Sequence, residues 1–156
     1  MTGMSPTPNV VRVSQTIRAT PERLFHAWTD PAQLARWWRM NGPGWTFAGA
    51  ALDLRVGGQY RLAMTGPDGK THTAFGVYRE IDPPKRLAFT WEWEDPERRI
   101  GNTVVTVDIH GLSTDTSEII LTHEGFADIA QAPGHESGWR QLLTLLDQTT
   151  AIEDAL

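Results

Sequence analysis

His123 is the side chain in this sequence whose type and place best suit acid–base chemistry. It belongs to the run IILTHE at 119–124, where Ile119, Leu121 and His123 alternate onto one face of an expected strand. If Leu121 lies in the core, His123 points inward too. An imidazole titrates near neutral pH, so an inward His123 could orient a ligand or move a proton. A buried, hydrogen-bonded structural histidine is the commoner alternative, and both interpretations stay open at this point.

Large aromatic side chains alternate along LAFTWEWE at 87–94. Four residues share the face that we predict to be inward: Leu87, Phe89, Trp91 and Trp93. Ligand pockets are mostly aromatic and apolar with a few polar anchors, so Trp91 and Trp93 are candidates for a pocket wall. Ordinary core packing is the alternative. Met64 and Phe75, on two other expected strands, could extend the wall, although plain core is the simpler role for both.

Two further groups could touch a ligand. Asp53 and Arg55 lie two apart in DLRVGG at 53–58, on one face of an expected strand. They form either an exposed ion pair of small energetic value or, through Arg55, a ligand anchor. Trp38, Trp45 and Phe47 flank a loop rich in Gly and Pro, which is either a lid at a cavity mouth or a docking contact for nearby helices.

Two short helices are predicted in ATPERLFHAWTDPAQLARWW at 19–38. Thr20 and Asp30 are expected N-caps, because their side-chain oxygens can accept a bond from a free backbone N–H. Pro21 and Pro31 follow at the first helical position, which suits proline. Helices of about eight to ten residues are not stable alone, so both must pack on a larger element.

That larger element is an expected antiparallel sheet. A strand over 11–17 precedes the helices, and six strand-like runs separated by turn signals follow them: 51–56, 60–65, 71–81, 87–94, 103–112 and 117–124. A final helix is predicted over 135–156, with Trp139 and Leu143 among the residues facing the sheet. These two form core if the interior is full and pocket wall if it is not. Residues 1–8 are expected to be a flexible tail, and residues 9–156 a single domain.

Composition excludes several classes of function. The chain has 156 residues, a formal net charge of −5 and no cysteine. The acidic balance argues against nucleic acid and anionic membranes, and the lack of cysteine removes disulfides and thiolate chemistry. We find no signal peptide, membrane-spanning run, nucleotide motif or metal-ligand spacing, so we expect a soluble, cytoplasmic protein without metal or cofactor.

Six stretches carry a resemblance to a known family: ATPERLFHAWTDPAQLARWW at 19–38, DLRVGGQYRLAM at 53–64, DG at 68–69, GVYREIDPPKRLAFTW at 76–91, LTHEGF at 121–126 and HESGWRQLLTLL at 135–146. In order and spacing they resemble the START-like (SRPBCC) superfamily, and most closely the branch named after the activator of the ninety-kilodalton heat-shock protein's ATPase. The resemblance implies an α+β helix-grip fold, in which a curved antiparallel sheet wraps around a long C-terminal helix and leaves a cavity. The superfamily includes lipid and hormone binders, polyketide cyclases and co-chaperone domains, so it defines the fold better than the function.

We rank three functions for this chain. The first is binding of a small apolar or amphipathic molecule in the cavity. The second is a co-chaperone-like, stress-related interaction with a heat-shock ATPase, and the third is a cyclase or hydrolase that uses His123. The candidate ligand-binding residues are Trp38, Trp45, Phe47, Arg55, Met64, Phe75, Trp91, Trp93, His123, Trp139 and Leu143.

Overall fold

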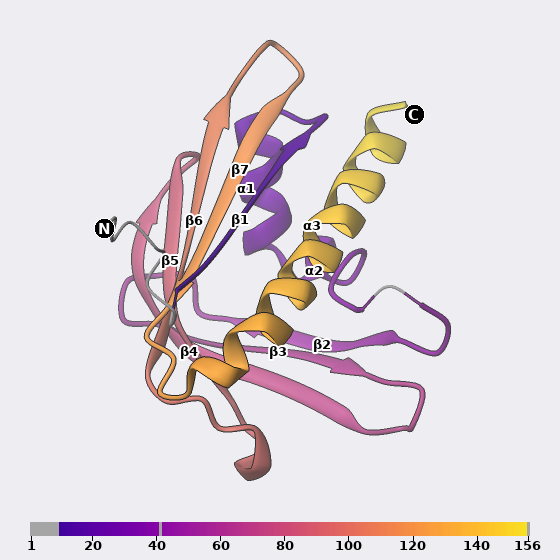
Figure 1. Ribbon diagram of the computed structural model, residues 1–156. Helices are drawn as coiled ribbons and strands as arrows, with labels where there is room; N and C mark the ends of the chain where they lie inside the picture. Colours follow the sequence, from indigo (N-terminus) through magenta and orange to yellow (C-terminus); the bar gives the residue numbers. More distant parts are fainter. Residues whose placement is uncertain (1–9, 41, 156) are drawn as a thin grey trace, which may run out of the picture.

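A strongly bent antiparallel sheet partly encloses one long helix (Figure 1). The computed structural model describes residues 10–40 and 42–155. Its elements in chain order are β1 (Val10–Ile17), α1 (Pro21–Thr29), α2 (Pro31–Leu34), β2 (Thr46–Leu52), β3 (Gln59–Thr65), β4 (Thr71–Asp82), β5 (Arg86–Trp93), η1 (Pro96–Arg98), β6 (Thr103–Gly111), β7 (Ser117–Glu124), η2 (Ile129–Gln131) and α3 (Ala132–Ala155). The seven strands form one sheet in the order β1-β7-β6-β5-β4-β3-β2, with every neighbouring pair antiparallel. The predicted α+β helix-grip fold is confirmed.

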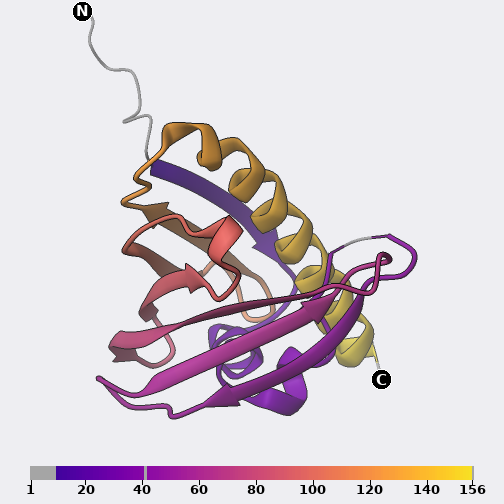
Figure 2. The same cartoon turned by 90° about the horizontal axis from the view of Figure 1, so that it is seen from below.

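The sheet bends where its strands are irregular. Register shifts interrupt the β2–β3 pairing between Phe47 and Gly49 and the β4–β5 pairing between Tyr78 and Glu80. Bulges of this kind bend a strand and increase its twist. Gly76 allows β4 and β5 to approach closely, because a Cβ there would lie 2.0 Å from the Thr90 carbonyl oxygen. The concave side that results faces α3 (Figure 2).

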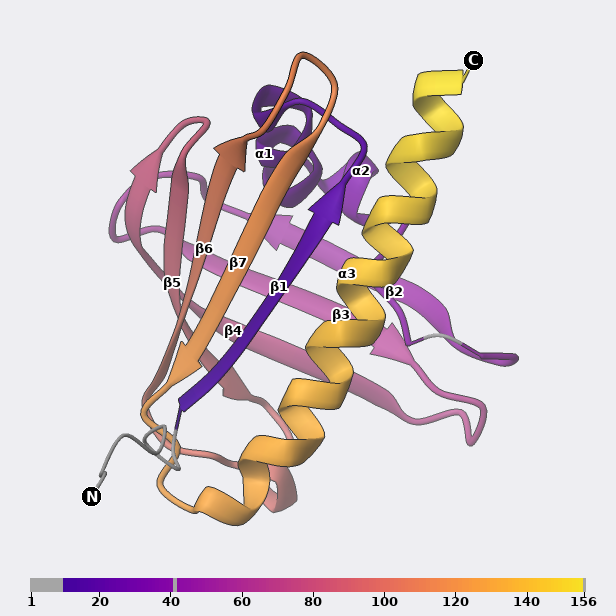
Figure 3. The ribbon, with the colours of Figure 1, turned by 45° about the horizontal axis from the view of Figure 1, so that its top comes forward.

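The two short helices close one end of this concave side, beside the β6–β7 turn (Figure 3). Both predicted caps are present: Arg23 N–H donates to Thr20 Oγ1, and Gln33 N–H donates to Asp30 Oδ2, each at 3.2 Å. The Ser117 hydroxyl donates to the Ala19 carbonyl at 2.8 Å and so joins the start of α1 to β7.

The second helix is shorter than predicted. α2 is a single turn, Pro31–Leu34, after which Trp37 and Trp38 both donate their backbone N–H to Leu34 O. A regular helix would turn two consecutive side chains about 100° apart. In the tighter turns that follow α2, Trp37 and Trp38 are both buried, each with 1% of its surface exposed.

Three predicted boundaries also differ from the structure. β2 begins at Thr46 and ends at Leu52, whereas a strand was expected over 51–56, because residues 53–58 fold into a turn closed by Gly58 N–H and Arg55 O at 2.8 Å. α3 begins at Ala132, so Pro133 lies in its first turn, where its missing N–H costs nothing. The predicted tail, residues 1–8, lies outside the described residues, as do Asn41 of the predicted loop and the end of the helix at Leu156. The extent of the domain, residues 9–156, stays a prediction.

Aromatic rings in edge-to-face and tilted contacts form the centre of the core. Ring centroids lie 4.8 Å apart for Trp28 and Trp37, 5.9 Å for Trp38 and Trp91, and 4.9 Å for Trp91 and Trp139. The last two pairs join elements far apart in the chain, so the cluster connects α1, the turns after α2, β5 and α3. Within residues 10–40 and 42–155, no helix combines the length and the apolar character needed to cross a bilayer.

Candidate functional site

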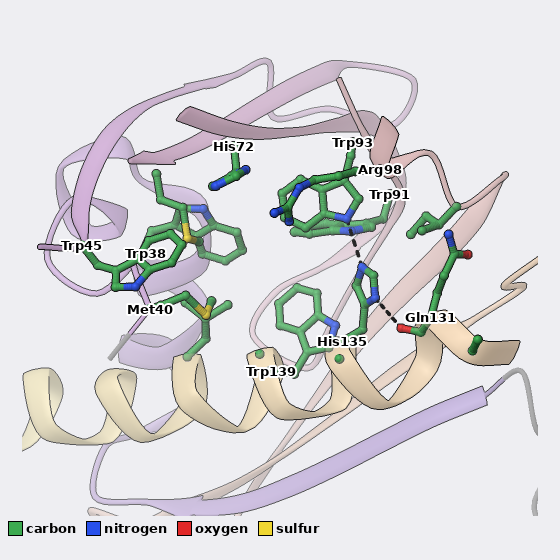
Figure 4. A pocket seen from close by; sticks show the side chains of 16 residues that line it. Trp38, Met40, Trp45, His72, Trp91, Trp93, Arg98, Gln131, His135 and Trp139 are labelled. Carbon is green, nitrogen blue, oxygen red and sulfur yellow. Dashed lines mark hydrogen bonds between the residues drawn. The ribbon is translucent and has the colours of Figure 1, made fainter. Parts of the chain in front are cut away.

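A cavity of about 380 Å³ lies between the concave face of the sheet and α3 (Figure 4). Six of the residues predicted to bind a ligand line it: Trp38, Trp45, Met64, Trp91, Trp93 and Trp139. The alternation along β3 and β5 explains three of them, because Met64, Trp91 and Trp93 point to the concave face, and helical spacing on α3 explains Trp139, which faces them. The periodicity of the sequence therefore identified several of the apolar side chains that form the cavity wall.

Two predicted site residues belong to the core instead. Leu143 is completely buried, and Phe47 is half-buried against the core beside its β3 partner Met64. Neither lines the cavity. Leu143 lies one residue beyond Leu142, which does line it, so the helix turns Leu143 away from the open space.

Two other predicted site residues face away from the cavity. Arg55 lies in the β2–β3 turn, where its exposed guanidinium donates to Asp53 Oδ2 at 2.9 Å, so it anchors nothing inside. Phe75 lies on the convex face of β4, beneath the Arg99 guanidinium at 5.4 Å from the ring centroid. The concave positions of β4 are taken by His72, Ala74 and Tyr78, one residue out of phase with the prediction.

His123 is inward but lies behind the cavity wall. It is fully buried on β7, where its Nδ1 accepts from the Trp139 indole N–H at 3.0 Å and its Nε2 lies 2.9 Å from Thr103 Oγ1. An indole N–H only donates, so Nδ1 carries no proton and Nε2 is the donor to Thr103. The Thr103 hydroxyl in turn donates to the Trp91 carbonyl at 2.6 Å.

This network fixes the chemistry of His123. Burial, with a smaller contribution from the charge of His135, lowers its pKa to about 3. Both ring nitrogens are occupied and the imidazole stays neutral, so His123 has no free lone pair for a substrate. The residue acts as a connector between α3, β7 and β6.

A second Trp–His pair, which the sequence analysis missed, borders the cavity itself. Trp93 Nε1 donates to His135 Nε2 at 3.0 Å, and His135 Nδ1 donates to the Gln131 carbonyl at 2.8 Å (Figure 4). Burial is the main cause that lowers the pKa of His135, so this imidazole is also neutral. Its place on the same helical face as Trp139, four residues earlier, is the signal that could have found it.

His72 is a polar side chain of the cavity wall that has an unpartnered ring nitrogen. Figure 4 shows it on the sheet side of the cavity, pointing inward from β4. It is 8% exposed, and its Nδ1 has no hydrogen-bond partner among the described residues. Burial and then the charge of Arg98 lower its pKa, so it is a neutral ring that can both donate and accept.

Two glycines on α3 leave room for the cavity. Gly134 and Gly138 both line it, four residues apart on one helical face. A Cβ built on Gly134 meets no atom within 4 Å, and one built on Gly138 meets only Met40 Cε at 3.9 Å. The pair explains why α3 and the sheet do not close the space, and its spacing was visible in the sequence.

Arg98 reaches the cavity from η1, on a segment held by side-chain caps. The Glu92 carboxylate accepts from Ile100 N–H at 2.9 Å and from Gly101 N–H at 3.0 Å. Asp95 Oδ1 accepts from Glu97 N–H at 3.0 Å at the start of η1. The side chains of Glu92 and Asp95 therefore position the segment that carries Arg98.

The arrangement suits binding better than metal chemistry. Within the described parts of the chain, no group of three or more His, Asp or Glu side chains is placed to hold a metal ion. The wall is mostly apolar and aromatic, with a few polar groups at one side, which is the composition of small-molecule pockets.

A bent antiparallel sheet that grips a helix over an apolar cavity defines a domain of the START-like kind. The chain belongs to the family described as Activator of Hsp90 ATPase homolog 1-like protein, which matches residues 18–151. The resemblance inferred from the six sequence stretches is thus confirmed. No curated protein matches the sequence.

Solved structures of the same fold come from several bacteria. Protein CV1439 from Chromobacterium violaceum has a TM-score of 0.78 and 28% identity, over 91% of this chain and 96% of that chain. The AHSA1 protein SPO3351 from Silicibacter pomeroyi has a TM-score of 0.78 and 27% identity, over 92% of this chain and 99% of that chain. Protein Mll3558 from Rhizobium loti has a TM-score of 0.73 and 28% identity, over 90% and 95%. These names state no ligand.

Proposed function

We propose that this protein binds a small apolar or amphipathic molecule in the cavity between the sheet and α3. The observation that carries the proposal is the cavity itself, whose volume of about 380 Å³ falls within the usual range for small-molecule sites. Protein interiors are otherwise packed to the density of organic crystals, so an apolar cavity of this size favours the binding of an apolar molecule.

The two α3 glycines support the same function. Glycine in a helix interior costs roughly 0.5–1 kcal/mol relative to alanine. At Gly138 a Cβ would meet only Met40 Cε at 3.9 Å, so local packing does not require a glycine there. A side chain longer than that of alanine would extend from this position into the cavity, so a small residue here keeps the space open.

Binding of N-phenyl-1-naphthylamine, a neutral fluorescent probe, tests the proposal. We expect wild type and Gly138→Ala to bind it with similar affinity, because the alanine methyl group adds little volume. Gly138→Leu should fill the space beside Met40 and weaken binding at least tenfold without lowering the free energy of unfolding. Equal binding by all three proteins would place the probe elsewhere and refute the proposal.

A second candidate comes from the family description, which names an activator of the Hsp90 ATPase. Under this alternative the protein contacts a heat-shock ATPase through its surface, in a stress-related role. ATPase stimulation by a molar excess of the purified protein would support it, and an unchanged ATPase rate would remove it. The cytoplasmic location expected from the sequence stays a prediction.

An enzyme that uses His123 is the weakest candidate. It would need a free ring nitrogen at the cavity, whereas both nitrogens of His123 are hydrogen-bonded behind the wall. A reaction at this site would have to use other groups, such as His72.

A further inference from the structure

We propose that the ligand is an apolar molecule with one anionic group, and that Arg98 binds this group at the cavity mouth. The inference rests on the proposed function and specifies the chemical class of the ligand. Its starting point is the charge of the cavity wall.

Arg98 is the one charged side chain among the described residues that line the cavity, and no carboxylate lines it. Within the described part of the chain, its guanidinium has no hydrogen bond or ion pair. Arg61 pairs with Glu94 at 2.6 Å and Arg86 with Asp108 at 2.6 Å, whereas Arg98, like the exposed Arg79 on β4, has no such pair among the described residues. In a protein of net charge −5, an arginine left unpaired at an apolar cavity is a site for an anion.

Most of the unpartnered polar groups in the cavity wall are hydrogen-bond donors, so a ligand that offers acceptors would satisfy them. The Trp91 indole N–H is buried without an acceptor, and an indole can only donate. Arg98 also only donates, and His72 Nδ1 is unpartnered. A carboxylate or sulfonate offers acceptor oxygens and no donor, so it complements the arginine and the histidine. Among the described lining residues, Gln131 Oε1 is an unpartnered group that can only accept, so it could take one donor group of the ligand.

Arg98 is held at this position before any ligand arrives. Its segment is fixed at one end by Asp95 and at the other by Glu92, and the Gln131 amide donates to the Arg99 carbonyl at 3.0 Å. Little ordering cost therefore remains for the backbone on binding, although the arginine side chain itself is exposed.

Two features add positive potential at the cavity. Burial is the main cause that lowers the pKa of His72 and of His135, and the charge of Arg98 acts in the same direction on both, while Asp68 and Asp95 oppose it at His72 and Glu92 opposes it at His135. α3 begins beside the same region, and its first turn contains no acidic side chain to cancel the positive end of the helix dipole. An anion is thus favoured and a cation is disfavoured.

Two probes that differ only in charge test this inference. N-phenyl-1-naphthylamine is neutral, and 8-anilino-1-naphthalenesulfonate is the same skeleton with one sulfonate. In Arg98→Gln we expect the affinity for the sulfonate to fall about tenfold, the effect of losing one charge-assisted hydrogen bond, while the neutral probe binds as before. Rising salt should weaken sulfonate binding to wild type more than to the variant.

Arg99→Gln is the matched control, because it removes the same charge one residue away, where the side chain lies over Phe75 on the convex face. It should leave the ratio of the two affinities unchanged. If the neutral probe binds wild type but both variants shift the ratio equally, or neither does, the anion site is refuted while the proposed function stands. If neither probe binds wild type, the proposed function fails and this inference fails with it.

Discussion

The Trp139 indole N–H donates to His123 Nδ1 at 3.0 Å, and both residues are buried. From this bond the hydrogen bonds run through His123 Nε2 and the Thr103 hydroxyl to the Trp91 carbonyl. One side-chain path thus joins α3 to three neighbouring strands directly behind the cavity. Because buried polar groups are costly when unpaired, this path fixes the position of α3 on the sheet.

Stability should fall in acid because His123 cannot take up a proton in the folded state. Its pKa is about 3 when folded and about 6.5 when unfolded, so between these values the unfolded chain binds the extra proton. The free energy of unfolding should therefore fall as pH drops from 6.5 towards 3, by up to about 1.4 kcal/mol per pH unit from this residue. The lowered pKa of His135 acts in the same direction.

Urea unfolding of wild type and His123→Gln between pH 7 and pH 4 measures this slope. The variant should show the shallower dependence, since glutamine does not titrate. His110→Gln, at an exposed position of β6, controls for the loss of one histidine and should follow wild type. Parallel slopes for wild type and His123→Gln would contradict the explanation.

Trp139→Phe should destabilise the fold by about 1–3 kcal/mol for the hydrogen bond, because His123 Nδ1 is left buried without a donor. Packing loss adds to this value. A double-mutant cycle with His123→Leu separates the two effects, since the bond is already absent in the leucine background. If the change in the free energy of unfolding of the double variant equals the sum of the two single changes, the bond contributes nothing.

Glu92→Ala should loosen the segment from Asp95 to Gly101 without unfolding the sheet. The carboxylate accepts from Ile100 N–H and Gly101 N–H, so both donors lose this acceptor in the variant. Hydrogen exchange of these amides should accelerate at least tenfold, while exchange in β6 and β7 stays slow. Glu94→Ala is the control, because Glu94 forms an exposed pair with Arg61 and should change neither.

Gly138→Ala should stabilise the protein by roughly 0.5–1 kcal/mol, because alanine suits a helix interior better than glycine and its methyl group meets only Met40 Cε. Gly76→Ala should have the opposite effect, since its Cβ would lie 2.0 Å from the Thr90 carbonyl oxygen. Thermal or urea unfolding compares the two. A destabilised Gly138→Ala would show that the space beside Met40 is not free.

Local patterns in the sequence indicated an antiparallel sheet and its strands, with β2 misplaced, and the family resemblance supplied the helix-grip arrangement. Alternation marked the strands, and Thr20 and Asp30 marked the helix starts, because these signals depend only on neighbouring residues. On β4, by contrast, both faces carry apolar side chains, so alternation alone could not choose between Phe75 and His72. The choice depends on how β4 pairs with β3 and β5, which brings in residues far away in the chain.

The polar residues of the site could not be predicted from such local patterns. Arg98 and Gln131 belong to the short helices η1 and η2, which have too few residues for a period to be recognised. Their positions follow from the capping contacts of Glu92 and Asp95 and from the Gln131–Arg99 bond. The bonds of His123 likewise join residues on three separate elements, and no local signal predicts them.

The clustered tryptophans have an optical consequence. Four tryptophans contact one another in sequence: Trp28 with Trp38, Trp38 with Trp91, Trp91 with Trp139, and Trp139 with Trp28. The ring centroids of each contacting pair lie within 6.5 Å. Three of these residues, Trp38, Trp91 and Trp139, line the cavity. Excitation energy passes readily between indoles at this spacing, so light absorbed by one ring is emitted by the group. A ligand that quenches one tryptophan of the wall therefore lowers the fluorescence of the whole cluster. Intrinsic tryptophan fluorescence thus reports whether the cavity is occupied.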